Sequence, residues 1–137
     1  MTADIRHPVF EELETKPILQ VRHWWGGVDL LECQTQPLLI ARPWGFITPS
    51  IVRKDVAAME EFATRTPSWD YIVDSKRVLL IHPLNGLVLK RVPKLPNIRR
   101  YIVAAPNPIL RCLFHLGRRL GGAFDVKRNL NEALASL

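Results

Sequence analysis

The sequence predicts one α/β domain in which a mixed β-sheet is flanked by helices. The chain has 137 residues, enough to bury one hydrophobic core and too few for two. Hydrophobic residues make up 47% of the chain and charged residues 23%, which is typical of a globular domain. Apolar residues change between strand-like and helix-like spacing along the chain. Strands that alternate with helices favour a mainly parallel sheet.

The first predicted elements are a hairpin and a helix. Residues 28–34 and 37–44 are rich in apolar side chains and are separated by a short polar turn, which favours two paired strands. Residues 49–66 then carry apolar side chains at helical spacing. Thr48 followed by Pro49 is typical of a helix start. The hairpin makes the predicted sheet mixed rather than purely parallel.

The second half of the chain alternates strands with helices. The predicted elements are strands at residues 68–74, 99–105 and 123–127, a short buried strand at 78–81, and helices at 84–92, 108–120 and 129–137. Asn107 followed by Pro108 predicts one of the helix starts, and Asn129 with Glu132 has the spacing of a capping box.

The predicted boundaries separate a partly ordered N-terminal extension at residues 1–27 from a folded domain at residues 28–137.

No apolar stretch is long enough to span a bilayer, and the polar start of the chain differs from a secretion signal. The two cysteines, Cys33 and Cys112, stand in unrelated contexts, which is typical of a reducing compartment. We therefore expect a cytoplasmic protein, with Cys112 buried among neighbouring leucines.

The net charge of +6 is distributed unevenly. Residues 1–74 contain 7 Lys/Arg and 11 Asp/Glu, whereas residues 75–137 contain 12 and 2. An acidic half folded against a basic half is one interpretation, and a basic face that binds phosphate groups is the other. An anionic lipid or membrane surface is favoured over nucleic acid, because leucines rather than aromatic residues lie among the basic side chains.

Three stretches resemble the STAS domain, the fold of bacterial anti-sigma-factor antagonists and of the cytoplasmic tail of sulfate transporters. They are "YIVDSKRVLLIHPLNGL" at residues 71–87, "YIVAAPNPILRCLF" at 101–114 and "FDVKRNLNEAL" at 124–134. Their order and spacing match the family from about residue 28 to 134. The resemblance implies a stand-alone STAS-like fold, and some relatives of this kind are likened to lipid-binding domains.

The resemblance also locates the place of the family's phosphorylation motif. Pro83 takes the place of the family's aspartate, and Leu84 takes the place of its phosphorylatable serine or threonine. Asn85 takes the next place, and Gly86 matches the glycine that follows. A leucine has no oxygen to accept a phosphoryl group, so a phospho-switch cannot operate here. Ser75 is the nearest hydroxyl, but it does not align with the motif.

The start of the helix that follows is the candidate site for a protein partner or an anion. Its free N–H groups and the lysines and arginines beyond it favour negative charge. The candidate residues are His82, Pro83, Leu84, Asn85, Gly86, Lys90, Arg91 and Lys94. The alternative is an ordinary helix start that is packed by its leucines.

Aromatic side chains form a second candidate site. Trp24, Trp25, Trp44 and Phe46 occur in the segments "HWWGG" and "RPWGF". They either line an apolar ligand pocket or close one end of the hydrophobic core.

The sequence gives no positive case for an enzyme. The four histidines show no metal-ligand spacing, no Cys-x-x-Cys occurs, and His82 has no recognisable nucleophile or carboxylate near it in sequence. We therefore predict no catalytic residues, no metal and no cofactor. The expected function is a non-catalytic regulatory module that docks a protein partner or a second copy of itself.

The alternative function is a carrier or sensor of a small amphipathic ligand such as a lipid. A docking module should have an apolar surface patch beside residues 83–86 and no cavity. A carrier should have an apolar cavity with a few polar groups.

Overall fold

Three strands from the N-terminal part of the chain form an antiparallel meander. The structure is a computed structural model, and it describes residues 10–137. β1 (Thr15–Arg22) pairs with β2 (Gly26–Cys33), and β2 pairs with β3 (Leu38–Ile47). The predicted hairpin is confirmed as β2 and β3.

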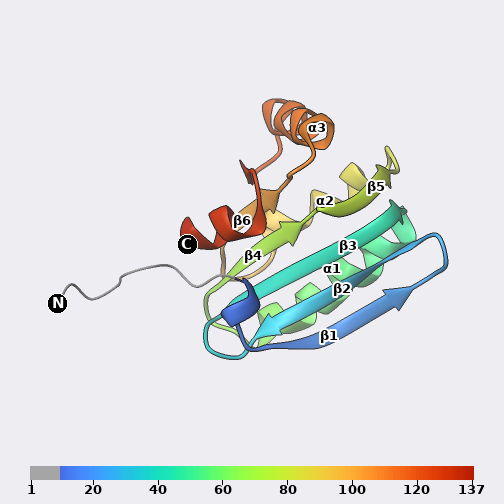
Figure 1. The fold of residues 1–137 in the computed structure, drawn as a ribbon. Helices are drawn as coiled ribbons and strands as arrows, with labels where there is room; N and C mark the ends of the chain where they lie inside the picture. Colours follow the sequence, from blue (N-terminus) through green and yellow to red (C-terminus); the bar gives the residue numbers. More distant parts are fainter. Residues whose placement is uncertain (1–9) are drawn as a thin grey trace.

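The later strands add to β3 in parallel and complete a mixed seven-stranded sheet (Figure 1). They are β4 (Trp69–Asp74), β5 (Arg77–Ile81), β6 (Ile98–Ala104) and β7 (Asp125–Lys127). The strand order is β1-β2-β3-β4-β6-β7, and β5 pairs with the far end of β3, beyond β4. The predicted α/β class with a mixed sheet is therefore confirmed.

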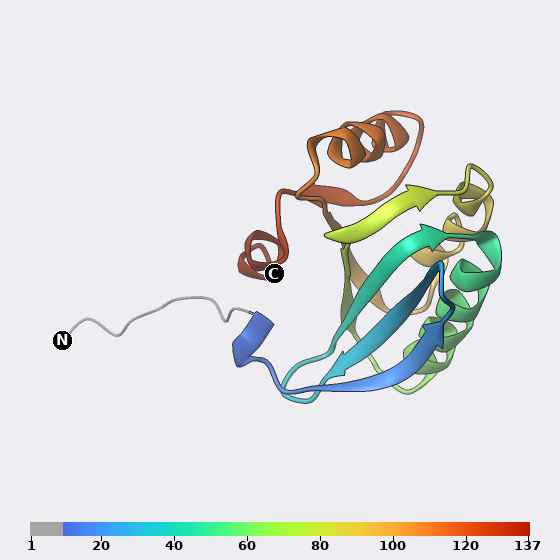
Figure 2. The ribbon, with the colours of Figure 1, turned by 45° about the vertical axis from the view of Figure 1, so that its right-hand side comes forward.

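Helices cover both faces of the sheet. They are α1 (Pro49–Thr64), α2 (Asn85–Leu89), α3 (Pro108–Arg119) and α4 (Leu130–Ala135), with 3-10 turns η1 (Phe10–Glu12) and η2 (Val92–Lys94). α1 and α2 lie on one face, whereas α4 and η1 lie on the other (Figure 2). In residues 10–137, no helix combines the length and the hydropathy that a bilayer crossing requires.

The predicted helix starts are confirmed by their capping bonds. Side-chain oxygens of Thr48, Asn107 and Asn129 accept backbone N–H bonds at 3.5, 2.9 and 2.8 Å. Each bond satisfies a donor that the first turn of a helix leaves without an intrahelical partner.

The central strands are apolar on both sides because each side is covered. Along β4, Tyr71 packs in the core beneath α1, and Ile72 packs in the core beneath α4. Both side chains are at most 1% exposed. The sheet is thus a rigid central layer from which the site described below is built.

The sheet begins earlier in the chain than the sequence predicts. Residues 15–22 fall within the predicted N-terminal extension, but they form β1, so the sheet begins before residue 28. Their pattern is weak because an edge strand tolerates Pro17 and buries little. Residues 1–9 of the extension lie outside the described residues.

The prediction that residues 78–81 are buried is wrong. Val78 is buried, but Leu79 is 84% exposed and Leu80 is 55% exposed. Leu79 falls at an irregularity in the pairing of β5 with β3, which interrupts the regular alternation of side chains, and neither leucine is covered. The reason is its position, since it extends the sheet beyond β4 along the end of β3.

The prediction that Cys112 is buried is also wrong, because this thiol is exposed. α3 packs against the rest of the molecule along one side only, where Leu110 is buried. Cys112 lies two residues further along the helix and faces away from that side. The apolar residues next to Cys112 in the sequence therefore predicted a buried thiol, whereas the position of α3 leaves this thiol exposed.

Gly45 should be essential where β3 passes the start of β2, next to the turn between β1 and β2. It has a φ of 70°, and a Cβ there would lie 2.4 Å from the carbonyl oxygen of Trp25. We expect Gly45→Ala to lower the free energy of unfolding by roughly 2–4 kcal/mol in urea denaturation.

Gly86→Ala is the matched control for this substitution. A Cβ on Gly86 would meet no heavy atom within 4 Å. We expect a stability change within about 1 kcal/mol, with a small gain from higher helix propensity. A Gly45→Ala variant as stable as wild type would contradict the close approach of Gly45 to Trp25.

Candidate functional site

The segment at Pro83–Gly86 is a surface turn with one residue directed inward. The backbone N–H of Leu84 donates to Nδ1 of His82 at 3.0 Å, and no ion pair joins this ring to a carboxylate within residues 10–137. Leu84 and Leu87 are 54% and 64% exposed. The start of α2 is therefore not packed by its leucines.

Asn85 is the inward-facing residue of this turn. It is 2% exposed, and its Nδ2 donates to the carbonyl oxygen of Ile47 at 2.9 Å. Its Oδ1 has no hydrogen-bond partner among the described residues. A buried side chain cannot contact a partner at the surface, so the structure assigns Asn85 to the interior instead.

The predicted basic residues divide into two kinds. Arg91 forms an ion pair with Glu60 of α1. Lys90 and Lys94 are exposed, and no ion pair involves them within residues 10–137. Only these two lysines therefore offer free charge beside the turn.

The four predicted aromatic residues do not form one pocket. Trp24 is 94% exposed on the turn between β1 and β2. Trp25 stacks on His23, with ring centroids 4.6 Å apart, and meets the edge of Phe46 at 6.2 Å. These contacts close the end of the meander, and Trp44 lies beside them on β3. None of the four lines the cavity described next.

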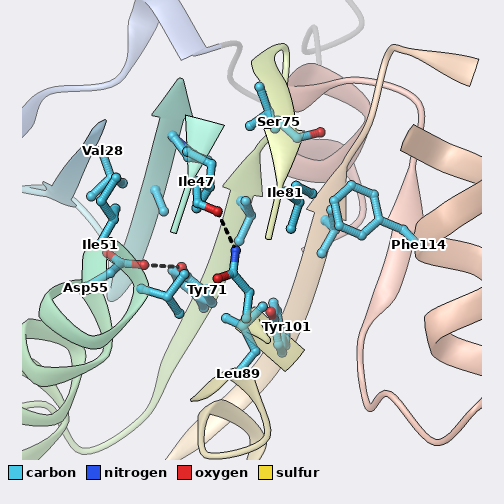
Figure 3. A pocket seen from close by; sticks show the side chains of 17 residues that line it. Val28, Ile47, Ile51, Asp55, Tyr71, Ser75, Ile81, Leu89, Tyr101 and Phe114 are labelled. Carbon is cyan, nitrogen blue, oxygen red and sulfur yellow. Dashed lines mark hydrogen bonds between the residues drawn. The ribbon is translucent and has the colours of Figure 1, made fainter. Parts of the chain in front are cut away.

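A cavity of about 80 Å³ lies between the sheet and the helices α1, α2 and α3 (Figure 3). Twelve of its 17 lining side chains are apolar. The five polar ones are Asp55, Tyr71, Ser75, Asn85 and Tyr101. Asp55 lies at one side of the cavity and Phe114 at the other (Figure 3). The space is thus an apolar chamber with its carboxyl group at the end away from α3.

Asp55 is the least expected group in this chamber. Tyr71 donates its hydroxyl hydrogen to Asp55 Oδ2 at 3.0 Å, while Oδ1 has no partner among the described residues. Burial raises the pKa of Asp55 to about 7, and the Tyr71 hydrogen bond opposes this only in part. Burial also raises the pKa of Tyr71 well above its usual value, so the phenol remains a donor.

Two buried acceptor oxygens on residues that line this apolar chamber therefore have no donor among the described residues. They are Oδ1 of Asp55 and Oδ1 of Asn85. Ser75 does not supply a donor, because its hydroxyl donates to the carbonyl oxygen of Ala104 at 2.7 Å. Buried polar atoms without partners are rare in folded proteins and commonly mark a site for water or a ligand.

A larger groove of about 610 Å³ adjoins the chamber. It lies between α2 and α3, and its wall includes Leu87, Leu120 and Phe124, with Lys90 and Lys94 at α2 and η2. Four side chains line both spaces: Leu89, Tyr101, Val103 and Phe114. The chamber and the groove are therefore neighbours that a single elongated molecule could occupy together.

The sequence contained a signal for Asp55 that the sequence analysis did not use. Val52, Val56 and Met59 mark the apolar side of α1, and Asp55 falls on the same side by spacing. An acidic residue within such an apolar stripe predicts a buried carboxyl group. The orphaned oxygen of Asn85 has no comparable signal, because its inward orientation depends on the bond to Ile47 of β3.

The raised pKa of Asp55 makes stability depend on pH. In the unfolded chain the carboxyl titrates near 3.8, and in the folded protein near 7. The protonated form therefore favours folding, and this contribution is complete below pH 3.8 and is lost as pH rises through 7. Relative to Asp55→Asn, the wild type should lose roughly 4 kcal/mol of unfolding free energy between about pH 4 and pH 8.

Urea denaturation at several pH values measures this difference. Glu61→Gln on the exposed side of α1 is the control, and its difference from wild type should stay nearly constant. A constant difference between wild type and Asp55→Asn would mean that the carboxyl is not destabilised by burial.

No model of a known protein family and no curated protein sequence matches this chain. Within residues 10–137, no three His, Cys, Asp or Glu side chains come together in a way that could hold a metal ion. The features of the molecule that bear on function are therefore the chamber, its two acceptor oxygens and the adjoining groove.

Proposed function

We propose that this protein binds a small amphipathic ligand and acts as its carrier or sensor, without chemical conversion. The observation that carries the proposal is the pair of buried acceptor oxygens without described donors on Asp55 and Asn85, two residues that line an apolar chamber. Each unsatisfied buried oxygen costs about 1–3 kcal/mol, so a ligand that donates to both recovers part of that free energy.

The polar end of the ligand should be neutral and should carry hydrogen-bond donors. A hydroxyl or amide group can donate to Asp55 Oδ1 whether or not the carboxyl is ionised. A carboxylate has no hydrogen to donate, and it would be repelled by ionised Asp55. Above pH 7, where Asp55 is mostly ionised, the chamber therefore selects alcohols and amides against fatty acids.

The apolar end of the ligand should extend toward the groove. Leu89, Val103 and Phe114 line both spaces and provide an apolar path past Tyr101. The chamber of about 80 Å³ holds a head group and a few carbon atoms, whereas the groove of about 610 Å³ has room for a longer chain.

Membership of a STAS-like family remains part of this proposal. The order of strands and helices agrees with the resemblance. Leu84 lacks a phosphoacceptor oxygen, so ligand binding rather than phosphorylation would control such a module.

A second candidate function is a regulatory docking module for a protein partner. It is favoured by Leu84 and Leu87, which are exposed beside Pro83. We rank it second because docking at this surface leaves the two buried acceptor oxygens without an explanation.

Two eight-carbon probes test the proposed ligand class. Octan-1-ol should raise the melting temperature of the protein at pH 8 and form a one-to-one complex in native mass spectrometry. Octanoate should do neither, because ionised Asp55 repels it. Equal stabilisation by both probes would contradict the proposed role of Asp55.

Two variants assign the binding to the chamber. Val103→Phe fills the junction between the chamber and the groove, and it should abolish the effect of octan-1-ol. Asp55→Asn supplies an amide donor and removes the charge, so it should admit octanoate. Leu80→Phe adds an aromatic ring at the surface and should behave as wild type. Octanol binding that survives in Val103→Phe would place the ligand elsewhere.

A further inference from the structure

Large exposed hydrophobic side chains gather on three elements. They are Leu79 and Leu80 of β5, Leu84 and Leu87 at α2, and Ile109, Leu113, Leu116 and Leu120 at α3, each more than half exposed. β5, α2 and α3 lie toward the same end of the molecule in both views (Figures 1 and 2), and α2 and α3 line the same groove. We call these eight side chains the leucine face. Clusters of this kind mark interaction surfaces.

α3 contributes half of the leucine face and is amphipathic. Ile109, Leu113, Leu116 and Leu120 are spaced by four, three and four residues, which places them along one side of the helix. Leu110 and Phe114 occupy the adjacent side and pack into the core. The apolar surface of α3 is thus wider than the part that the core covers.

Basic residues occur on and next to the elements that carry the leucine face, and acidic residues are missing from the same part of the sequence. Residues 75–124 contain ten Lys/Arg and no Asp or Glu. Lys90, Lys94 and Arg119 are exposed, and no ion pair involves them within residues 10–137. On α3, Arg118 pairs with Asp125 of β7. The surroundings of the face therefore carry free positive charge.

We propose that the leucine face docks on an anionic membrane surface. Its leucines would enter the interface between head groups and acyl chains, and the surrounding lysines and arginines would pair with lipid phosphates. A basic helix with an uncovered apolar side is typical of such binding. Neither contribution depends on the ligand that the chamber holds.

A membrane fits this surface better than a second copy of the chain does. Two leucine faces brought together would also bring together their basic residues, and residues 75–124 supply no acidic group to offset the repulsion. Leu79 and Leu80 are exposed at an irregularity in the pairing of β5 with β3, so a protein partner would need a surface shaped to this irregularity. A bilayer admits protruding side chains without a complementary shape.

Docking would bring the groove to the bilayer. Leu87 and Leu120 belong to the leucine face and also line the groove. A membrane molecule with a hydroxyl or amide end could then enter the chamber directly. This last step rests on the proposed function, whereas docking itself does not.

Sedimentation with vesicles tests the docking. We expect the full chain to bind vesicles of equal parts phosphatidylcholine and phosphatidylglycerol at about 0.1 M salt, and to be largely released at about 0.5 M. Binding to pure phosphatidylcholine should be at least roughly tenfold weaker. A fluorophore on Cys112, which is exposed on α3, should report a less polar environment on binding. A chain that stays in the supernatant with the anionic vesicles would overturn the proposal.

Paired variants separate the two contributions to docking. Leu116→Gln with Leu120→Gln should weaken binding by roughly tenfold or more, and so should Lys90→Gln with Lys94→Gln. Arg53→Gln with Lys54→Gln removes two exposed charges from α1 and should change binding less than about twofold. Equal losses in the two charge variants would show attraction by net charge alone and would overturn the docking surface.

Two further measurements distinguish membrane docking from self-association and from ligand binding in the chamber. A stable dimer in analytical ultracentrifugation that Leu116→Gln with Leu120→Gln dissociates would mean that a second copy covers the face, and it would overturn the proposal. Val103→Phe, which fills the junction of the chamber, should still bind anionic vesicles as wild type does. A failure of octanol binding can therefore be told from a failure of docking.

Discussion

The hydrogen bond from Tyr71 to Asp55 is the constraint on which the rest of this site depends. It joins α1 to the central strand β4 in the middle of an apolar core. One carboxyl oxygen is satisfied by the phenol, and the other has no donor among the described residues. A carboxyl group in this position lowers stability unless it is protonated or receives a second donor. The site thus lacks a hydrogen-bond donor to Asp55 Oδ1, which water or a ligand can supply.

The chamber, the groove and the leucine face form a sequence from the interior to the surface. Asp55 and Phe114 lie at opposite sides of the chamber, and Tyr101 and Phe114 line both the chamber and the groove. Leu87 and Leu120 belong both to the groove and to the exposed face. Along this path, hydrogen-bond acceptor oxygens at the inner end are followed by apolar side chains and then by basic side chains at the surface. This order matches a molecule with a small polar head that enters from a membrane.

Most of the fold could be predicted from the sequence, because local signals and burial agree there. Helix caps at Thr48, Asn107 and Asn129 and the apolar runs of β4 and β6 indicate their elements directly. β1 was missed because an edge strand with one buried residue gives little pattern. The exposure of β5 and of Cys112 could not be predicted, since it depends on where those elements sit and not on their own residues.

The candidate site could be predicted only in part. The turn at Pro83–Gly86 was identified, and it does adjoin the groove. The interior role of Asn85 depends on a bond to Ile47, 38 residues earlier in the chain. The tryptophans were natural pocket candidates, but they close the end of the meander, where no sequence rule distinguishes packing from ligand binding. Asp55 was predictable in principle from its place in the apolar stripe of α1.

NMR titration of the Asp55 carboxyl carbon shows whether this carboxyl group is destabilised by burial and holds the ligand. In protein that native mass spectrometry shows to be free of ligand, we predict a pKa near 7, caused by burial. Saturation with octan-1-ol should lower this pKa by roughly one unit, because a donor to Oδ1 stabilises the ionised form. A pKa close to the ordinary 3.8, or one that octan-1-ol leaves unchanged, would contradict the claim that Asp55 holds the ligand.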